Sequence, residues 1–530
     1  MPKGKTAAQL LGANEFRNLS GLISNLRARR IVSEATHADT IVMQAPDNAP
    51  AGSNELQAVA ALNLGNAASF VEGNVVGRAK PRMQVMRSWD DTVVVKANAS
   101  ALAAMRVTSP GLRIFQSTYL YPQYIKPLGA ELETAGLEVA AGPQPKTFTV
   151  KLVDSGGSSI QGVLVKALLD WNGAHVKAET DASGLAKLSL PKAFPKVVML
   201  TVEPHHTYWS QYLNGFVRAS APRQLVVELR ELLPDSFELF KHYAPYDETA
   251  GAGVTVGVID CGVGPHKALK VAGGACLVTG ESATQHKDNG LGHGTHVAGT
   301  IAAKRLLGTN VYGLAPACKL MAYRVCPNRG DETERGRATS TDVAAAIERA
   351  IGDGCDLINI SMGSTEAMPE VPAMLEKARA AGVVVLAATG NDGLELLRYP
   401  GRYSLAVAVG AHGRDETIPE NCPEIFHESD IRRKSEFVAE FSNHGVGTDL
   451  IGPGVAVLST FPGHRYAMMS GTSMSTPYST GMAARILAHN VGVLAMPKDA
   501  ARSDAIVQML SVAAMQAGWP DGYSGFGMLK

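Results

Sequence analysis

The second half of the chain alternates short apolar runs with longer segments in which apolar residues recur at helical spacing. An apolar run without polar positions predicts a parallel strand that is covered on both faces. We expect strands at residues 254–259, 320–325, 357–361, 383–388 and 405–410, and helices at residues 294–305, 340–353, 374–381, 478–489 and 500–514. This alternation predicts an α/β domain over residues 236–530, with a parallel sheet between two layers of helices.

The first part of the chain has shorter apolar runs and predicts a different domain. Residues 38–128 follow the order strand, helix, strand, strand, helix, strand, which is typical of an α+β ferredoxin-like domain. The expected strands are 40–43, 82–86, 92–96 and 112–118, and the expected helices are 54–70 and 99–107. Residues 1–37 precede this domain and are predicted to form an N-terminal helical extension.

Residues 146–232 contain short strands at regular spacing, separated by turns that carry Gly and Asp. This pattern is typical of a small antiparallel β-sandwich. Its expected strands are 147–153, 163–169, 185–190, 197–203 and 225–229. The loose segment before it, residues 129–145, is rich in Ala, Gly and Glu and is predicted to be a linker.

Three polar residues occupy positions at which such a fold can place catalytic groups. Asp260 directly ends the first expected strand of the α/β domain, and active groups of parallel sheets belong at the carboxyl ends of strands. Ser473 precedes a helical run, where unpaired backbone N–H groups can hold an oxyanion. His293, in the motif Gly-His-Gly-Thr-His, would supply the base that a serine hydroxyl needs. Taken singly, the three also fit a turn former, an N-cap and a helix cap.

The order Asp260, His293, Ser473 is the subtilisin order, and the three motifs together resemble the subtilisin family of serine proteases over roughly residues 236–530. The resemblance implies an Asp-His-Ser triad that hydrolyses peptide bonds through an acyl-enzyme intermediate. It implies that His293 moves the proton and that Asp260 orients the imidazole. It also implies that Asn391, in the segment Thr-Gly-Asn-Asp-Gly, donates its side-chain amide to the oxyanion.

The same resemblance implies a cleft in which an extended substrate adds as a strand. Its implied walls are Ser361, Met362 and Gly363 on one side and Gly336, Arg337 and Ala338 on the other. Arg398 falls in a family segment near the floor of the specificity pocket, where its charge would favour an acidic substrate side chain. We expect it to lie on the surface loop instead.

The position of residues 38–128 ahead of such a domain resembles the inhibitory propeptide of many subtilisin-like proteases. The resemblance implies an intramolecular inhibitory partner whose C-terminal tail, here residues 117–122, lies in the substrate cleft. We therefore expect a self-inhibited precursor that acts on protein or peptide substrates. Two alternatives stay open: the first domain is an unrelated packing or recruitment module, or the chain is a catalytically silent regulatory or binding protein on a protease fold.

Composition narrows the remaining choices of partner and compartment. Lys plus Arg and Asp plus Glu both number 49, so no net charge favours nucleic acid or an anionic membrane. No apolar run approaches the roughly eighteen residues of a membrane span, and no secretory h-region is visible, so we expect a cytoplasmic protein, with secretion left open. The six cysteines show no metal spacing and are expected to be reduced. No cofactor or metal is expected to be required; calcium binding stays open, although the usual family ligands are not evident.

Overall fold

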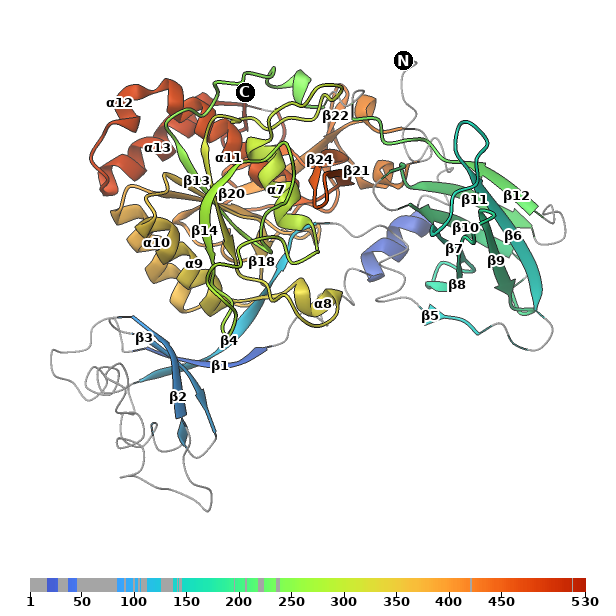
Figure 1. The fold of residues 1–530 in the computed structure, drawn as a ribbon, viewed down its shortest axis with the longest axis horizontal. Helices are drawn as coiled ribbons and strands as arrows, with labels where there is room; N and C mark the ends of the chain where they lie inside the picture. Colours follow the sequence, from blue (N-terminus) through green and yellow to red (C-terminus); the bar gives the residue numbers. More distant parts are fainter. Residues whose placement is uncertain are drawn as a thin grey trace.

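The structure is a computed structural model of the 530-residue chain. It describes residues 17–26, 37–44, 83–89, 92–98, 101–102, 105, 112–124, 137–140, 142, 145–194, 196–204, 207–217, 224–234, 239–419, 422–516 and 518–530. Figure 1 shows a large α/β body, a small sheet below it and a separate group of strands on the right. Within these ranges, no helix combines the length and the apolar character that a membrane crossing requires.

The α/β body is built on a sheet that has nine strands in the described part of the chain. Their order is β14-β15-β13-β17-β19-β20-β22-β21, with β23 also beside β20. All pairings from β14 to β20 are parallel, as is that of β20 with β23, whereas β21 and β22 form an antiparallel edge. The prediction of a parallel sheet is confirmed for the strands from β14 to β20, whereas the antiparallel edge was not predicted. The strands are β13 Thr255–Asp260, β14 Val271–Cys276, β15 Lys319–Arg324, β17 Leu357–Ile360, β19 Val384–Ala388, β20 Ala406–Arg414, β21 Glu428–Arg433, β22 Glu436–Ala439 and β23 Leu450–Pro453.

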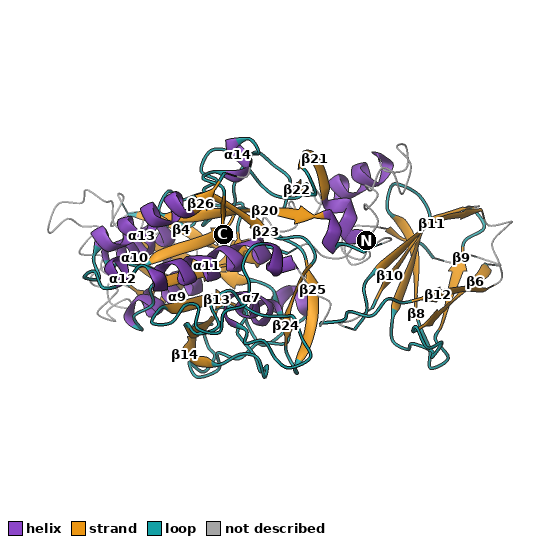
Figure 2. Ribbon diagram, turned by 90° about the horizontal axis from the view of Figure 1, so that it is seen from above, coloured by secondary structure: helices purple, strands orange, loops and turns teal. Residues whose placement is uncertain are grey.

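Helices cover both faces of this sheet (Figure 2). Helices α7, α11 and α13 share one hydrophobic core with the sheet, and α9 and α10 share the other. Alternate residues of β19 enter the two cores, with Val384 and Leu386 in the first and Val385 and Ala387 in the second. The helices are α7 His293–Ala302, α8 Glu332–Arg335, α9 Ser340–Gly352, α10 Glu370–Ala380, α11 Thr472–His489, α12 Val491–Leu494, α13 Ala500–Ala513 and α14 Asp521–Ser524.

Shorter elements complete the α/β body. Two small antiparallel strand pairs and three 3₁₀ turns are found among its described residues. They are β24 Val457–Phe461 with β25 Arg465–Met469, β26 Ala514–Met515 with β27 Met528–Leu529, and η1 Leu239–His242, η2 Asp415–Thr417 and η3 Pro423–His427.

The small N-terminal sheet has the strand order β4-β1-β3-β2, and all its pairings are antiparallel. Its strands are β1 His37–Gln44, β2 Met83–Ser88, β3 Thr92–Ala97 and β4 Arg113–Pro122. The expected helix 54–70 lies outside the described residues, whereas Ala101, Leu102 and Met105 of the other expected helix are helical. Strand β4 runs to Pro122 instead of ending at residue 118, because it continues into the α/β body and pairs there with β16 Ala338–Thr339 and β18 Met362–Gly363.

The next region consists of two sheets around one hydrophobic core, with the orders β11-β10-β7-β8-β5 and β12-β6-β9. The predicted antiparallel pairing holds for most of these strands, but it is wrong for two pairs, since β5 pairs with β8 and β12 with β6 in parallel. Strand β5 belongs to the expected linker 129–145 and shows no apolar pattern, because both of its residues are exposed at a sheet edge. The strands are β5 Leu137–Glu138, β6 Lys146–Val153, β7 Leu164–Leu168, β8 Ala174–Glu179, β9 Leu185–Leu190, β10 Lys196–Glu203, β11 Gln211–Val217 and β12 Gln224–Glu228.

A helix at residues 17–26 packs between this two-sheet region and the α/β body. Leu19, Leu22 and Leu26 lie on one helix face, and each is at most 2% exposed. They share a cluster with Tyr212 of β11 and Phe426 of η3, whose ring centroids lie 4.5 Å apart. The N-terminal helix is therefore part of a core that joins two units of the chain.

Candidate active site

Asp260 and His293 lie together at the carboxyl end of β13. The Nδ1 atom of His293 is 2.8 Å from Oδ1 and 3.0 Å from Oδ2 of Asp260, and both side chains are fully buried. A Cβ on Gly294 would lie 2.2 Å from the carbonyl oxygen of Gly262, so only glycine lets the helix start approach the strand end this closely. The Nε2 atom of His293 is buried, and no described residue forms a hydrogen bond with it. It is therefore open to a proton-transfer partner.

Asp288 holds the turn that presents His293. Its Oδ1 accepts the backbone N–H groups of Gly290 and Gly292 at 2.8 and 2.9 Å, and its Oδ2 accepts the hydroxyl of Thr295 at 2.6 Å. Burial raises the pKa of this carboxyl to about 6, although the hydrogen bonds favour its charged form. The negative charge of Asp288 at the start of α7 also suits the positive end of the helix dipole.

Ser473 is the second residue of α11, and it makes three hydrogen bonds around the cleft. Its backbone N–H donates to the carbonyl oxygen of Gln123 at 2.7 Å. Its hydroxyl donates to the carbonyl oxygen of Ser361 at 2.7 Å, and the Ser361 hydroxyl donates to the Ser473 carbonyl at 3.1 Å. The structure therefore joins His293 to Asp260, but it directs the hydroxyl of Ser473 to Ser361 and not to the imidazole.

Asn391 follows β19 and lies beside the loop before Ser473. Its Oδ1 accepts the backbone N–H and the hydroxyl of Thr472, both at 2.9 Å, which turns its Nδ2 the other way. That Nδ2 is buried, and within the described ranges it has no hydrogen-bond partner. A Cβ on Gly471 would lie 2.4 Å from the Gln123 carbonyl oxygen and 3.2 Å from the Asn391 Nδ2. The side-chain amide of Asn391 and the carbonyl oxygen of Gln123 thus both lie close to Gly471. The φ angle of Gly471, 149°, also disfavours a side chain at this position.

The cleft predicted from the sequence is filled by β4. The strand lies antiparallel to β18 on one side and to β16 on the other. The opposed residues are Tyr121 and Gly363, Pro122 and Met362, Leu120 and Ala338, and Tyr119 and Thr339. The guanidinium of Arg337 lies 4.5 Å above the ring of Tyr119, whereas Gly336 lies outside the paired residues. Both predicted walls therefore contact an extended segment of the chain itself.

The segment in the cleft continues past the predicted tail 117–122 by two residues. The backbone N–H of Gln123 donates to the carbonyl oxygen of Ser361 at 3.0 Å. The ring of Tyr124 follows, with its centroid 5.3 Å from that of His293. No local motif in the sequence marks either residue; only the extension of the last expected strand into the cleft could have located them.

Arg398 and the side chain of Gln123 both lie next to Gly363, since a Cβ there would be 3.1 Å from the Arg398 Cβ and 3.2 Å from the Gln123 Cδ. The expectation of a surface position for Arg398 is wrong. Arg398 is 3% exposed, and its guanidinium makes two hydrogen bonds of 2.7 Å with the buried carboxylate of Asp392. Since the carboxylate compensates the charge, an acidic substrate side chain is not favoured by Arg398. The Gln123 amide instead donates to the carbonyl oxygens of Tyr121 at 2.7 Å and Gly363 at 3.4 Å.

Two other side chains near the site, those of His296 and Cys261, are buried and contact backbone groups. His296 is fully buried, and its Nε2 lies 3.0 Å from the carbonyl oxygens of both Val457 and Ala467; burial lowers the pKa of His296 to about 3. Cys261 is buried, accepts the N–H of Gly294 at 3.2 Å, and burial raises the pKa of its thiol. All six cysteines are free. In the part of the chain that is described, no group of three His, Cys, Asp or Glu side chains is arranged to hold a metal ion, so no carboxylate set for calcium is found there.

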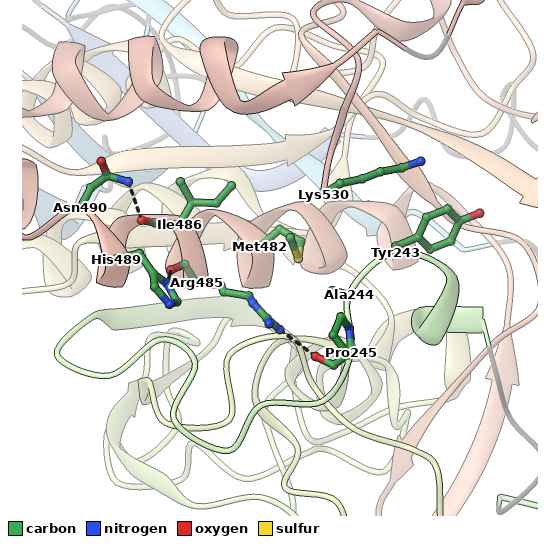
Figure 3. A pocket seen from close by; sticks show the side chains of 9 residues that line it. All are labelled: Tyr243, Ala244, Pro245, Met482, Arg485, Ile486, His489, Asn490 and Lys530. Atoms are coloured by element: carbon green, nitrogen blue, oxygen red, sulfur yellow. Dashed lines mark hydrogen bonds between the residues drawn. The ribbon is translucent and has the colours of Figure 1, made fainter.

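A separate pocket of about 320 Å³ lies beside the C-terminal half of α11, and its lining on that helix begins at Met482, roughly 14 Å along the helix from Ser473 (Figure 3). Arg485 donates to the carbonyl oxygen of Pro245 at 2.9 Å, and His489 contacts the carbonyl oxygen of Arg485 at 2.8 Å. These basic side chains satisfy backbone groups near the negative end of the helix. Asp260, His293 and Ser473 are not among the residues that line this pocket, and we assign it no role.

The α/β body matches known proteins. A model of the Subtilase family matches residues 251–519, a range that includes Asp260, His293 and Ser473. Subtilisin BL from Lederbergia lenta is 38% identical over 240 residues, which cover 45% of this chain and 78% of the relative. Subtilisin DY from Bacillus licheniformis is 38% identical over 242 residues, which cover 45% of this chain and 77% of the relative. M-protease from Shouchella clausii (strain KSM-K16) is also 38% identical over 240 residues, which cover 55% of its length. The chain belongs to the subtilase family, and it is a subtilisin-like serine endopeptidase.

Proposed function

We propose that the chain is made as a self-inhibited precursor in which Asp260, His293 and Ser473 cut the peptide bond between Gln123 and Tyr124. The hydrogen bond from the Ser473 N–H to the Gln123 carbonyl oxygen is the observation that carries this proposal. A carbonyl held by the N–H of a catalytic serine occupies the place where an oxyanion develops during acyl transfer.

In the proposed reaction, the Ser473 hydroxyl turns about χ1 from the Ser361 carbonyl towards Nε2 of His293. His293 takes its proton while Oγ attacks the carbonyl carbon of Gln123. The N–H of Ser473 and Nδ2 of Asn391 stabilise the oxyanion, and Asp260 stabilises the imidazolium. The C–N bond then breaks, and His293 gives the proton to the amine of Tyr124. A water molecule, deprotonated by His293, hydrolyses the acyl-enzyme and releases the carboxylate of Gln123.

The N-terminal sheet fits the role of the inhibitory domain. Its order β4-β1-β3-β2 supports the split βαβ arrangement, and its last strand supplies the segment in the cleft. Outside the cleft, Arg87 contacts Asp342 at 2.6 Å, and the indole N–H of Trp89 donates to Glu348 at 2.9 Å. Both acceptors lie on α9, so the N-terminal sheet also contacts the α/β body outside the cleft. We propose that the two-sheet region is a β-sandwich that separates the inhibitory and catalytic domains.

For other substrates, we propose an extended protein or peptide segment that replaces β4. The residue at the position of Leu120 would be buried, since Leu120 is 0% exposed within the apolar cluster that includes Ala338 and Met362. The residue at the position of Gln123 would place a hydrogen-bond donor against the carbonyl oxygen of Gly363.

The test is intact-mass analysis of the purified wild type beside Ser473→Ala. We expect the wild type to separate into chains 1–123 and 124–530 and the variant to stay whole. A fluorophosphonate probe provides a second readout, because it labels only an activated serine. The silent binding protein would be favoured instead if the wild-type chain stays uncut and the probe labels neither this chain nor a chain truncated to begin at about residue 236.

A further inference from the structure

We propose that the cleft contains a distal subsite, formed by Ser340 and Glu370, that selects a serine at the seventh position before the cut. The inference rests on the proposed function, because it treats β4 as a bound substrate ending at Gln123. The residue in question is Ser117, which lies near the start of the segment that enters the cleft.

The contacts form a short chain of buried hydroxyl and carboxyl groups. The Ser117 Oγ lies 2.9 Å from the Ser340 Oγ, which also accepts the backbone N–H of Thr118 at 3.2 Å. The Ser340 hydroxyl in turn donates to Oε1 of Glu370 at 2.5 Å. Ser117 and Ser340 are 0% exposed and Glu370 is 1% exposed, so these bonds lie away from bulk solvent.

The donor count explains why a hydroxyl is needed at this position. A serine hydroxyl offers one proton and two acceptor sites. Since the proton of Ser340 is used by the Glu370 carboxylate, both of its acceptor sites are left for the bound segment. The Thr118 N–H takes one, and the Ser117 O–H takes the other. An apolar side chain at position 117 would leave a buried acceptor unpaired, and a large one would have no space.

The subsite is built into the catalytic body and does not depend on the inhibitory domain. Ser340 is the first residue of α9 and Glu370 the first residue of α10. The Oε2 atom of Glu370 is buried, and among the described residues it has no hydrogen-bond partner. The hydrogen bond to Ser340 is thus the side-chain contact that stabilises this buried carboxyl, and it fixes the direction of the Ser340 proton.

The neighbouring Thr118 offers a matched control. Its Oγ1 is also buried but has no hydrogen-bond partner in the described structure, although its backbone N–H does. Thr118→Val therefore removes a buried hydroxyl without removing a hydrogen bond, whereas Ser117→Ala removes one that is bonded. If the subsite recognises the hydroxyl of Ser117, Ser117→Ala must slow the cut more than Thr118→Val does.

The test follows the appearance of the chain beginning at Tyr124 during refolding of the full-length precursor. We expect Ser117→Ala and Ser340→Ala each to slow the cut about tenfold, with the double variant no slower than the slower single one. Thr118→Val should stay within about twofold of the wild type, as expected for a hydroxyl that forms no bond. Equal rates for Ser117→Ala and Thr118→Val, or single effects that multiply in the double variant, would overturn the subsite.

A second measurement avoids any folding defect of the variants. The processed wild-type enzyme is given peptides of residues 115–126 that carry Ser, Ala or Thr at position 117. We expect kcat/KM to fall about tenfold from Ser to Ala. Equal values for Ser and Ala contradict the subsite alone, whereas a wild-type precursor that is never cut after Gln123 contradicts the proposed function itself.

Discussion

The carbonyl oxygen of Ser361 accepts two hydrogen bonds, one from the Ser473 hydroxyl at 2.7 Å and one from the Gln123 N–H at 3.0 Å. A carbonyl oxygen has two lone pairs, so the Ser473 hydroxyl and the backbone of Gln123 can share it. Turning Ser473 towards His293 costs the hydroxyl this bond, a net loss of about 1 kcal/mol. That cost is small beside the barrier to peptide hydrolysis, so the observed orientation is compatible with catalysis.

Asn391→Asp is expected to lower kcat about 100- to 1,000-fold and to leave KM within a few fold. The carboxylate keeps the acceptor that holds Thr472, but it replaces the free Nδ2 with an oxygen that repels the oxyanion. Steady-state kinetics of the processed enzyme on a peptide substrate measures the change. Thr472→Ser keeps both hydrogen bonds to Asn391 and is the control, for which kcat should change less than about threefold. A rise in KM with normal kcat would assign Asn391 to ground-state binding.

Gln123→Glu is expected to slow processing about tenfold or more, because its carboxylate would face the carbonyl oxygens of Tyr121 and Gly363. Gln123→Met has a similar shape without the charge and should slow it less. The rate of formation of the 124–530 chain, followed by mass, measures both. Faster cutting of the Glu variant would mean that Arg398 attracts an acidic side chain despite its pairing with Asp392.

The comparison with the sequence shows which parts of the site local patterns can reveal. Asp260, His293, Asn391 and Ser473 stand in motifs at strand or helix ends, and such positions can be predicted from apolar runs and their boundaries. Arg398 was placed wrongly because an arginine in a loop is usually exposed, and its buried partner Asp392 is recognisable only once the loop is folded.

Contacts between residues far apart in the chain could not be predicted from local patterns. Ser117, Ser340 and Glu370 lie up to 253 residues apart in the chain, and their hydrogen bonds depend on how three elements pack. The parallel strand β5 has two exposed residues, so no apolar pattern distinguished it from a linker. The alternation of strands and helices along the α/β body, by contrast, can be predicted from its strong pattern of buried runs.

Glu424→Gln is expected to flatten the dependence of stability on pH. Burial raises the pKa of Glu424 from 4.5 to about 7, despite its hydrogen bond from Ser470. A folded-state pKa above the unfolded value means that stability is fully present below pH 4.5 and is lost as the pH rises through about 7. The loss is up to about 3 kcal/mol from this group, and Asp288 and Asp449, with pKa values raised to about 6, add to it in the same direction.

Urea unfolding of the Ser473→Ala precursor between pH 5 and 7.5 tests this, since that variant cannot cut itself. The free energy of unfolding should fall with pH in the precursor and fall less in Glu424→Gln. The exposed Glu376 on α10 is the control, and Glu376→Gln should keep the full slope. An unchanged slope in both variants would mean that Glu424 is ionised throughout this range.

Leu22→Asp is expected to speed the loss of the 1–123 fragment after cleavage. Leu22 is 2% exposed in the core between the two-sheet region and the α/β body, and burying an unpaired carboxylate there is unfavourable. Size-exclusion chromatography of the cut chain should show the wild-type fragments eluting together and the variant fragments separating. Ser24→Asp, on the exposed side of the same helix, should behave as the wild type. Equal retention in both variants would show that the cleft alone holds the fragment.

The helix at residues 17–26 would hold the N-terminal fragment at a second contact, in addition to that of β4 with the cleft. When β4 dissociates from the cleft, this second contact would keep the strand nearby, so rebinding of β4 would compete with dissociation of the whole fragment. If the proposed cut occurs, cleavage and the gain of activity on other substrates would then be two separate events. A gel would show two bands from a population that is still inactive, until the contacts of Leu19, Leu22 and Leu26 are broken or the helix is degraded.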